Sequence, residues 1–125
     1  MAIPNVLLQR QTPTDFGLDI MQGDDLVITV SYEVDNTALD FSDCTAEAIF
    51  YSTDKTALLT VSGVVTALDG KITVTLTKAQ TAAFSTTGLD PIGPQQFRLG
   101  TWDLELSGDG KRKTLERGDT TLWGD

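Results

Sequence analysis

Alternating apolar and polar residues mark the clearest elements of the chain. In residues 26–34, 71–77 and 101–107, apolar side chains occupy every second position and polar side chains lie between them. A period of two places the two sets on opposite faces of a β-strand, so one face of each strand is expected to be buried. Residues 45–51 show a weaker form of the pattern. The expected core residues are Leu26, Ile28, Val30, Tyr32, Ala46, Ala48, Phe50, Ile72, Val74, Leu76, Trp102, Leu104 and Leu106.

Turn signals divide these strands into an antiparallel arrangement. Asp69-Gly70 and Asp109-Gly110 tolerate positive φ, so residues 64–77 and 102–117 are each predicted to form a hairpin. About seven short strands at spacings near ten residues predict an all-β fold, an antiparallel β-sandwich. Further weak strand patterns occur at residues 16–21, 57–68 with a break at Ser62-Gly63, 113–117 and 120–123.

One short helix and two irregular segments complete the pattern. Residues 78–84 predict a helix of at most two turns, with Thr77 as its N-cap. Residues 1–15 contain two prolines around an apolar run, so we expect an extended N-terminal arm before a single sandwich domain at residues 16–125. Residues 85–98 contain two glycines and two prolines without a period, which is typical of a long functional loop.

The arm and the loop are the candidate contact regions. Neither has the periodicity to join the domain's own sheet, and the apolar side chains of the arm would be unfavourable in water. We therefore expect them to contact neighbouring subunits. The candidate partner-binding residues are Ile3, Val6, Leu7, Leu8, Pro91, Ile92, Pro94, Phe97 and Trp123.

Charge and hydropathy narrow the classes of partner. The 125 residues suit one domain and carry a net charge of −9, the wrong sign for a protein that neutralises phosphates, so no nucleic-acid partner is expected. Residues 11–54 hold ten carboxylates and no cation, which indicates either a solvated acidic face or a surface complementary to a basic partner. No stretch approaches 18 apolar residues and no secretory signal is visible, so we expect no membrane partner and a cytosolic site of synthesis.

The residue types exclude most catalytic chemistry. The chain has no histidine, which removes the commonest general base and zinc ligand, and its one cysteine, Cys44, is expected to be a buried apolar residue. Close carboxylate pairs arise from the acidic composition alone, so we expect no enzyme and no catalytic residues. Residues 35–43 offer oxygen ligands for calcium but lack the spacing of a calcium loop. No metal or other cofactor is therefore expected.

Five segments carry a resemblance when they are taken in order. They are FGLDIMQGDDL at 16–26, LDFSDCTAEA at 39–48, GKITVTLT at 70–77 with AQT at 79–81, GTWDLEL at 100–106, and RGDTTL at 117–122. Together they resemble the N-terminal domain of the baseplate upper proteins of tailed bacteriophages and related tail-associated modules. The resemblance implies an immunoglobulin-like antiparallel β-sandwich with a structural role in a phage particle.

This resemblance also implies the partners and location. A tail, baseplate or fibre-attachment component would bind other virion structural proteins and copies of itself, be oligomeric within the particle, and reside in the virion after synthesis in the host cytoplasm. Two alternatives remain open. A capsid decoration or cement protein would show the same small, acidic, β-rich sequence, and a carbohydrate-binding module would use exposed aromatic residues such as Tyr51, Phe97 or Trp123.

Overall fold

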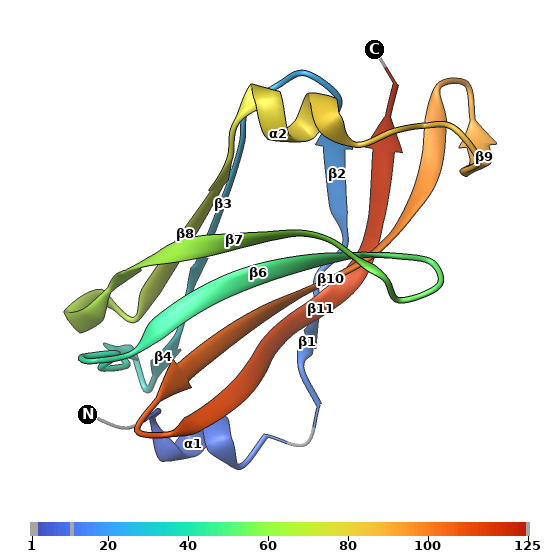
Figure 1. The fold of residues 1–125 in the computed structure, drawn as a ribbon. Coiled ribbons are helices and arrows are strands. Elements are labelled where there is room, and N and C mark those ends of the chain that lie inside the picture. Colours follow the sequence, from blue (N-terminus) through green and yellow to red (C-terminus); the bar gives the residue numbers. More distant parts are fainter. Residues whose placement is uncertain (1–2, 11, 125) are drawn as a thin grey trace.

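The protein is an all-β sandwich, as the alternation predicts (Figure 1). The computed structural model describes residues 3–10 and 12–124. Within these residues the helices are α1 (Asn5–Leu8) and α2 (Lys78–Ala83), with a 3-10 turn at Ala67–Asp69. The strands are β1 (Thr14–Asp15), β2 (Leu18–Met21), β3 (Leu26–Ser31), β4 (Glu33–Val34), β5 (Thr37–Ala38), β6 (Thr45–Ser52), β7 (Ala57–Thr66), β8 (Lys71–Leu76), β9 (Asp90–Gly93), β10 (Gln96–Gly108) and β11 (Lys111–Trp123).

Nine of these strands form one curled sheet whose two halves pack face to face. The strand order is β1-β11-β10-β6-β7-β8-β3, with β2 beside β11 and β9 beside β10, while β4 and β5 form a small separate hairpin. Strand β7 connects the halves, because Gly63 pairs with β6 and Val64 with β8. The break expected at Ser62-Gly63 is therefore a change of partner within one strand. A Cβ at Gly63 would lie 3.2 Å from Ile72 Cγ2, so this corner leaves little room for a side chain.

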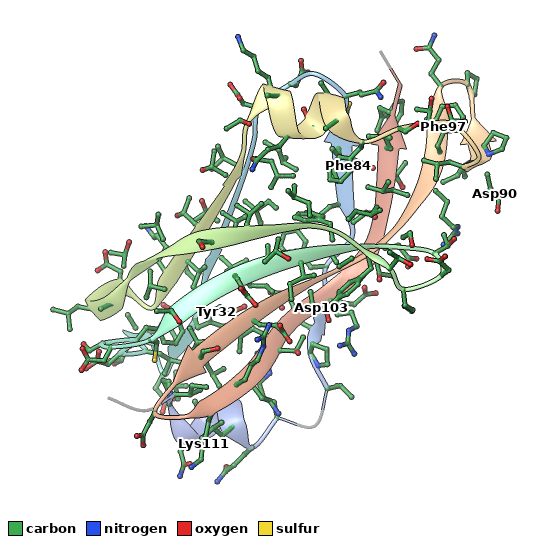
Figure 2. All side chains as sticks on the ribbon, viewed as in Figure 1. Tyr32, Phe84, Asp90, Phe97, Asp103 and Lys111 are labelled. Atoms are coloured by element: carbon green, nitrogen blue, oxygen red, sulfur yellow. The ribbon has the colours of Figure 1, made fainter. Side chains whose placement is uncertain are left out.

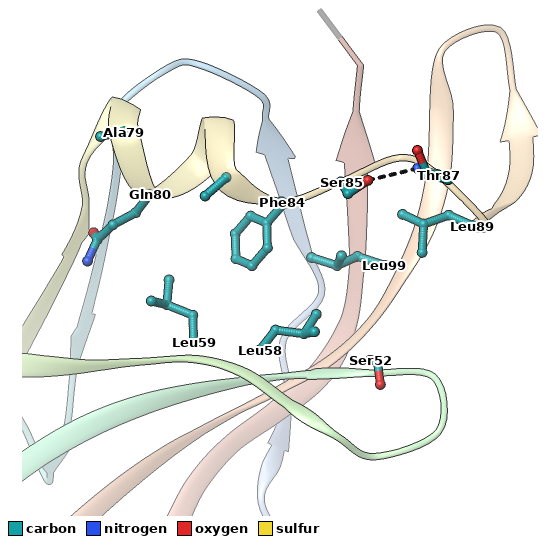
Figure 3. Close-up of a pocket in the computed structure, with 11 residues that line it drawn as sticks. Ser52, Leu58, Leu59, Ala79, Gln80, Phe84, Ser85, Thr87, Leu89 and Leu99 are labelled. Carbon is teal, nitrogen blue, oxygen red and sulfur yellow. Dashed lines mark hydrogen bonds between the residues drawn. The ribbon is translucent and has the colours of Figure 1, made fainter.

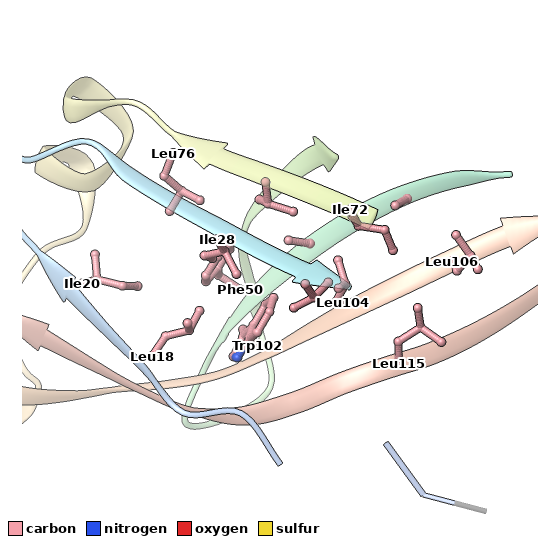
Figure 4. Packing of buried hydrophobic residues seen from close by; sticks show 14 of the residues in the cluster. Leu18, Ile20, Ile28, Phe50, Ile72, Leu76, Trp102, Leu104, Leu106 and Leu115 are labelled. Atoms are coloured by element: carbon pink, nitrogen blue, oxygen red, sulfur yellow. The ribbon is translucent and has the colours of Figure 1, made fainter. Parts of the chain in front are cut away.

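The core lies between the two halves of the sheet (Figure 4). Eleven of the thirteen expected core residues are buried, and Leu26 and Tyr32 are partly buried against them. Trp102 lies at the centre, where its ring stacks on Phe50 at 6.0 Å and meets Phe16 edge-on at 5.8 Å. The assignment of faces from the alternation is therefore confirmed, as is the burial of Cys44.

The two predicted hairpins form with different loops. Gly108 pairs with Lys111, and Asp109 and Gly110 have φ values of 51° and 73°, so the predicted two-residue loop is confirmed. In the other hairpin Thr66 pairs with Lys71, and the 3-10 turn fills a longer loop that ends at Gly70. The hairpin is thus confirmed but its two-residue loop is wrong.

Helix α2 begins as its sequence predicts. Gln80 N–H donates to Thr77 Oγ1 at 3.2 Å and Thr77 N–H donates to Gln80 Oε1 at 2.9 Å, which is a complete capping box. The buried Thr81 hydroxyl donates to the carbonyl of Asp24 at 2.8 Å and accepts from Gly23 N–H at 3.1 Å. These bonds fix α2 to the turn between β2 and β3.

The prediction of an extended arm at residues 1–15 is wrong where the structure describes this segment; residues 1, 2 and 11 lie outside the described residues. Pro4 is the N-cap of α1, and Ile3 and Leu7 are buried in the chain's own core. A proline fits the start of a helix because the first backbone N–H groups have no partner within it. The apolar run therefore folds back onto the sandwich instead of extending from it.

Two parallel pairings also depart from the antiparallel prediction. Strand β1 pairs with β11 from Thr14↔Glu116, and β2 pairs with β11 from Leu18↔Thr120, both in parallel. The N-terminal segment thus runs along the edge of the sheet beside the C-terminal strand. Local alternation identifies a strand but carries no information on its direction relative to a distant partner.

The loop expected at residues 85–98 is partly sheet. Strand β9 pairs antiparallel with the start of β10, with Pro91 opposite Phe97 and Asp90 opposite Arg98. The turn between them contains Gln95 at a φ of 59°. The expectation that this segment stays outside the sheet is therefore wrong for its second half. Proline is compatible with β9 because this short strand lies at an edge of the sheet.

Candidate interaction surface

An apolar groove of about 550 Å³ opens at the end of the sandwich that holds α2 (Figure 3). Helix α2 and the chain that follows it form one wall, and residues of β6, β7 and β10 form the other. The volume is within the range of sites that take small molecules or short side-chain clusters. None of its lining residues is charged. They are Ser52, Leu58, Leu59, Ala79, Gln80, Ala83, Phe84, Ser85, Thr87, Leu89 and Leu99.

Local structure holds the groove open. Phe84 ends α2, and its carbonyl accepts a hydrogen bond of 2.7 Å from Gln22 Nε2, while its buried ring lies 6.1 Å from that of Phe50. On the opposite wall, Leu59 pairs with Phe50 and Ala57 with Tyr51, so Leu58 is the extra residue of a β-bulge. A bulge re-aims a side chain, and Leu58 is 44% exposed at the groove.

The β9–β10 hairpin lies at the same end of the molecule and carries further exposed apolar residues (Figure 1). Leu89, which precedes β9, and Leu99, which lies in β10, both line the groove. Pro91, Ile92 and Pro94 project from the hairpin and are exposed, Ile92 by 53%. We call the groove-lining residues together with Pro91, Ile92 and Pro94 the α2-end surface.

Five of the nine candidate partner-binding residues lie at this end of the molecule. Besides these three residues, Phe97 is half-buried within the hairpin itself, opposite Pro91. Trp123 is half-buried beside the hairpin, where it pairs with Gln96. Figure 2 shows Phe84 and Phe97 at the same end of the molecule. The structure therefore brings the C-terminal candidates to the end of the molecule that holds the groove, although none of them lines it.

The four N-terminal candidates lie at the opposite end, on and around α1 (Figure 1). Ile3 and Leu7 are buried in this chain's core, so the prediction that they contact a neighbouring subunit is wrong. Leu8 is half-buried against the core, and Val6 is 44% exposed. The two sets of candidates cannot form one continuous surface.

Sequence reasoning missed most of the groove. The sequence places Phe84 at the end of a helix without indicating a role, and it gives no reason to expect Leu58, Leu59, Leu89 or Leu99 at a binding surface. The available signal was the pair Leu58-Leu59, since two successive apolar residues interrupt the alternation and are typical of a bulge. The position of this bulge opposite α2 depends on the pairing of β7 with β6, which a local pattern does not contain.

A second, charged face covers β10 and β11. Arg117 donates from Nε to Asp103 Oδ1 at 2.8 Å and from Nη2 to Oδ2 at 3.1 Å, and this pairing raises the pKa of the guanidinium. Asp103 lies on the outer face, as the alternation predicts, where it lines a surface pocket with Thr101 and Arg117. The Arg117 side chain covers Asp103, so Asp103 is only 8% exposed. Arg112 likewise bonds Glu105 and Glu47. The arginines of this face are thus occupied by carboxylates of the same chain.

Neither metal chemistry nor a membrane span is indicated in the described part of the chain. Residues 3–10 and 12–124 contain no group of three or more His, Cys, Asp or Glu residues arranged to hold a metal ion. In the segment considered for calcium, Asp40 Oδ1 accepts hydrogen bonds from the Ser42 hydroxyl at 2.5 Å and from Ser42 N–H at 2.8 Å, and these bonds lower the pKa of this carboxyl. The backbone bond forms an ordinary Asx turn. No helix among these residues has the length and hydropathy to cross a membrane.

A buried carboxyl lies near the α1 end of the molecule. Glu116 is 5% exposed because the β-bulge in β11 turns its side chain toward the interior, opposite Leu104. Burial raises the pKa of Glu116, and the nearby hydroxyl groups of Thr14 and Tyr32 and the charge of Arg10 partly offset this effect. Burial raises the pKa of Tyr32 as well. The interior therefore favours the neutral form of Glu116.

We expect Glu116→Gln to stabilise the protein at pH 7 by about 1–3 kcal/mol, because the variant does not bury a charge. The folded-state pKa is raised, so the stability that the protonated carboxyl contributes is present at low pH and is lost as the pH rises through this pKa. The advantage of the variant should therefore vanish in acid. Thermal unfolding between pH 3 and 8 measures it, with the exposed Glu33→Gln as control. A pH-independent difference would contradict this assignment.

Comparison with known proteins assigns no family. The scan against protein-family models and the search of the curated proteins found no match. Among solved structures, the chain is similar to the crystal structure of the ZIG-8-RIG-5 IG1-IG1 heterodimer, with a TM-score of 0.43 and 9% identity over 91% of this chain and 87% of that chain. The role of the α2-end surface therefore has to follow from its own residues.

Proposed function

We propose that the protein is a structural component of a tailed-bacteriophage particle, in its tail, baseplate or fibre-attachment region, and that it acts through contacts with neighbouring virion proteins. In this proposal it is made in the host cytoplasm and resides in the virion. The resemblance of five segments, taken in order, to tail-associated phage modules supports this assignment to a class of virion proteins. Each of these segments contributes to a strand, namely β2 and β3, β6, β8, β10 and β11. The resemblance thus concerns the framework of the fold.

The α2-end surface is the observation that carries the proposal. Its groove is open, about 550 Å³ in volume and uncharged, and the β9–β10 hairpin with the exposed Ile92 lies at the same end of the molecule (Figure 1). Contiguous apolar surface in contact with water is unfavourable and commonly marks a site that a partner covers. The occupant that fits this lining is an apolar segment of a neighbouring virion protein, with its side chains in the groove and its backbone against Ser52, Gln80 and Thr87 at the rim.

Two charge substitutions test this role. Leu58→Glu and Ile92→Glu each place a carboxylate on the α2-end surface at a partly exposed position, so folding should be little affected. We expect incorporation of each variant into particles to fall by on the order of tenfold or more, because the buried charge would lack a partner. The measurement is quantitative immunoblotting of purified particles produced in cells that supply the variant in place of the natural chain.

Leu68→Glu is the matched control. Leu68 is 76% exposed in the 3-10 turn between β7 and β8, far from the groove, so the same new charge should leave incorporation unchanged. Thermal midpoints of all three variants should stay close to that of the natural chain. Normal incorporation of both surface variants, or an equal loss in the control, would contradict the proposed docking role of the α2-end surface.

A further inference from the structure

Strand β3 has a free backbone edge. It pairs with β8 on one side, and on its other side no strand is present among residues 3–10 and 12–124. Tyr32 N–H donates to the carbonyl of Gly70 at 2.9 Å, and the antiparallel register continues from this pair through Val30↔Ile72 and Ile28↔Val74. Residues two apart in an antiparallel ladder direct their backbone groups to the same side. The N–H and C=O groups of Val27, Thr29 and Ser31 therefore point away from β8, toward the free edge.

This edge lacks the features that normally prevent strand addition. Strand β3 contains no proline, no charged residue and no register shift along its six residues. The other edge strands carry such features, since β9 contains Pro91, β2 is four residues long with an exposed Asp19, and β1 is two residues long. Natural proteins commonly block exposed edges by these means. Strand β3 thus has an unprotected edge, whereas β1, β2 and β9 have features that hinder strand addition. This difference indicates that β3 pairs with a strand of another protein chain.

The side chains beside the edge suit an added strand. Val27, Thr29 and Ser31 are exposed on the outer face, Val27 by 60%. Thr73 of β8 lies opposite Thr29, and Val64 of β7 lies opposite Thr73, so the outer face continues as a row of β-branched side chains. Such a face packs well against alternating β-branched residues of a neighbouring strand.

Charge at the ends of β3 indicates the chemistry of the partner. Exposed Asp24 and Asp25 precede the strand, and exposed Glu33 and Asp35 follow it. Lys71 and Lys78 belong to β8 and the start of α2, on the paired side of β3, where Asp25 Oδ1 accepts a hydrogen bond from Lys78 N–H at 2.7 Å. Arg10 lies close enough to Tyr32, just after β3, for its charge to lower the pKa of that hydroxyl. The free edge is therefore an uncharged strand between two acidic ends.

We propose that β3 accepts an extended strand of a partner protein, with β-branched residues in its centre and Lys or Arg at both ends. The added strand would receive backbone hydrogen bonds from Val27, Thr29 and Ser31, and its terminal cations would meet the acidic ends. A second copy of this chain fits less well. Antiparallel pairing of two β3 strands would place the Asp24–Asp25 end of each beside the acidic Glu33–Asp35 end of the other.

Peptides with the natural protein test this proposal. The probe has a Val-Thr-Val-Thr-Val core between Lys-Lys ends; one comparison peptide carries Glu-Glu ends, and another has N-methylated core amides. We expect the Lys peptide to bind with an affinity on the order of tenfold or more above both others, and to weaken as salt rises, since exposed charges are screened. Titration calorimetry gives the affinities. Equal binding of the Lys and Glu peptides would overturn the charge assignment, and binding of the N-methylated peptide would overturn strand addition.

Amide hydrogen exchange locates the binding. The Lys peptide should slow exchange at Val27, Thr29 and Ser31 by on the order of tenfold, while Ile28 and Val30, already bonded to β8, change little. Binding without protection of these three amides would overturn the assignment to this edge. The measurement needs no substitution, so it does not depend on the folding of a variant.

A pair of substitutions at one position isolates the backbone contribution. Thr29→Pro removes the central free N–H without removing a donor of the β8 ladder, and should abolish peptide binding. Thr29→Val keeps the N–H and should bind the peptide normally. Sedimentation of the natural chain without peptide measures whether the protein forms a dimer. A dimer that Thr29→Pro dissociates and Thr29→Val preserves would show that a second copy, not a basic strand, occupies the edge, and would overturn the proposal.

Discussion

Replacing Trp102 with alanine is expected to lower the free energy of unfolding by about 3–5 kcal/mol, the usual range for removing a buried tryptophan. Trp102 is fully buried and packs between Phe16 and Phe50 where the two halves of the sheet face each other. Its Nε1–H also donates to the carbonyl of Phe16 at 2.6 Å. The substitution therefore leaves both a cavity and a carbonyl without its donor.

Urea unfolding followed by circular dichroism measures this loss, since tryptophan fluorescence changes with the substitution itself. Trp102→Phe keeps a ring but not the indole donor, so it should lie between the natural chain and Trp102→Ala. Trp123→Ala is the positional control, because Trp123 is half-buried at the end of β11. A loss at Trp102 no larger than the loss at Trp123 would contradict the central place of Trp102 in the core.

Replacing Gly100 with alanine is expected to prevent cooperative folding or to destabilise the protein by on the order of 4 kcal/mol or more. Gly100 follows a register shift in β10, where the strand approaches the end of β6. A Cβ at this position would lie 1.9 Å from the carbonyl oxygen of Tyr51, which belongs to the backbone of β6. The clash is with main chain, so no side-chain rotation relieves it.

Gly17→Ala is the control for Gly100→Ala. A Cβ at Gly17 would lie 3.6 Å from the carbonyl of Asp119, an ordinary van der Waals distance. Its thermal midpoint, followed by circular dichroism, should therefore stay near that of the natural chain, while Gly100→Ala should show a large decrease or no cooperative transition. Similar midpoints for the two variants would contradict the close approach of β10 and β6.

The core and the main strands could be predicted because their signals are local. Alternation in β3, β8 and β10 fixes which side chains face inward, and the Asp109-Gly110 pair specifies its own loop. Helix α2 was predictable for the same reason, since Thr77 and Gln80 complete the capping box within one turn. Each of these features depends on residues that are close in the sequence.

The N-terminal segment could not be predicted in this way. Each of the two prolines only removes one backbone donor, because proline has no N–H group. Nothing near Leu7 in the sequence indicates that this side chain lies in the domain's own core. The parallel pairing of β1 with β11 joins residues about a hundred positions apart, as in Thr14↔Glu116. Such contacts are decided by the shape of the finished sandwich.

The candidate site was predicted in part. The exposed hairpin residues Pro91, Ile92 and Pro94 were found because glycine and proline interrupt the strand pattern around them. The groove beside them was not, because it arises where the Leu58 bulge of β7 faces Phe84 of α2. A groove between two elements that are distant in the sequence leaves no periodic pattern of residues from which it could be predicted.

The proposed role in a virion is tested most directly by locating the protein in purified particles. Quantitative mass spectrometry across a density gradient, applied to tailed-phage particles produced from the genome that encodes the chain, measures its copy number relative to tail and capsid proteins. The account predicts that the chain peaks with intact particles and stays with the tail fraction, at a fixed ratio to tail proteins, when tails and capsids are separated. A chain that remains with the soluble proteins of the lysate would contradict the proposed structural role, and one that stays with capsids would contradict its place in the tail.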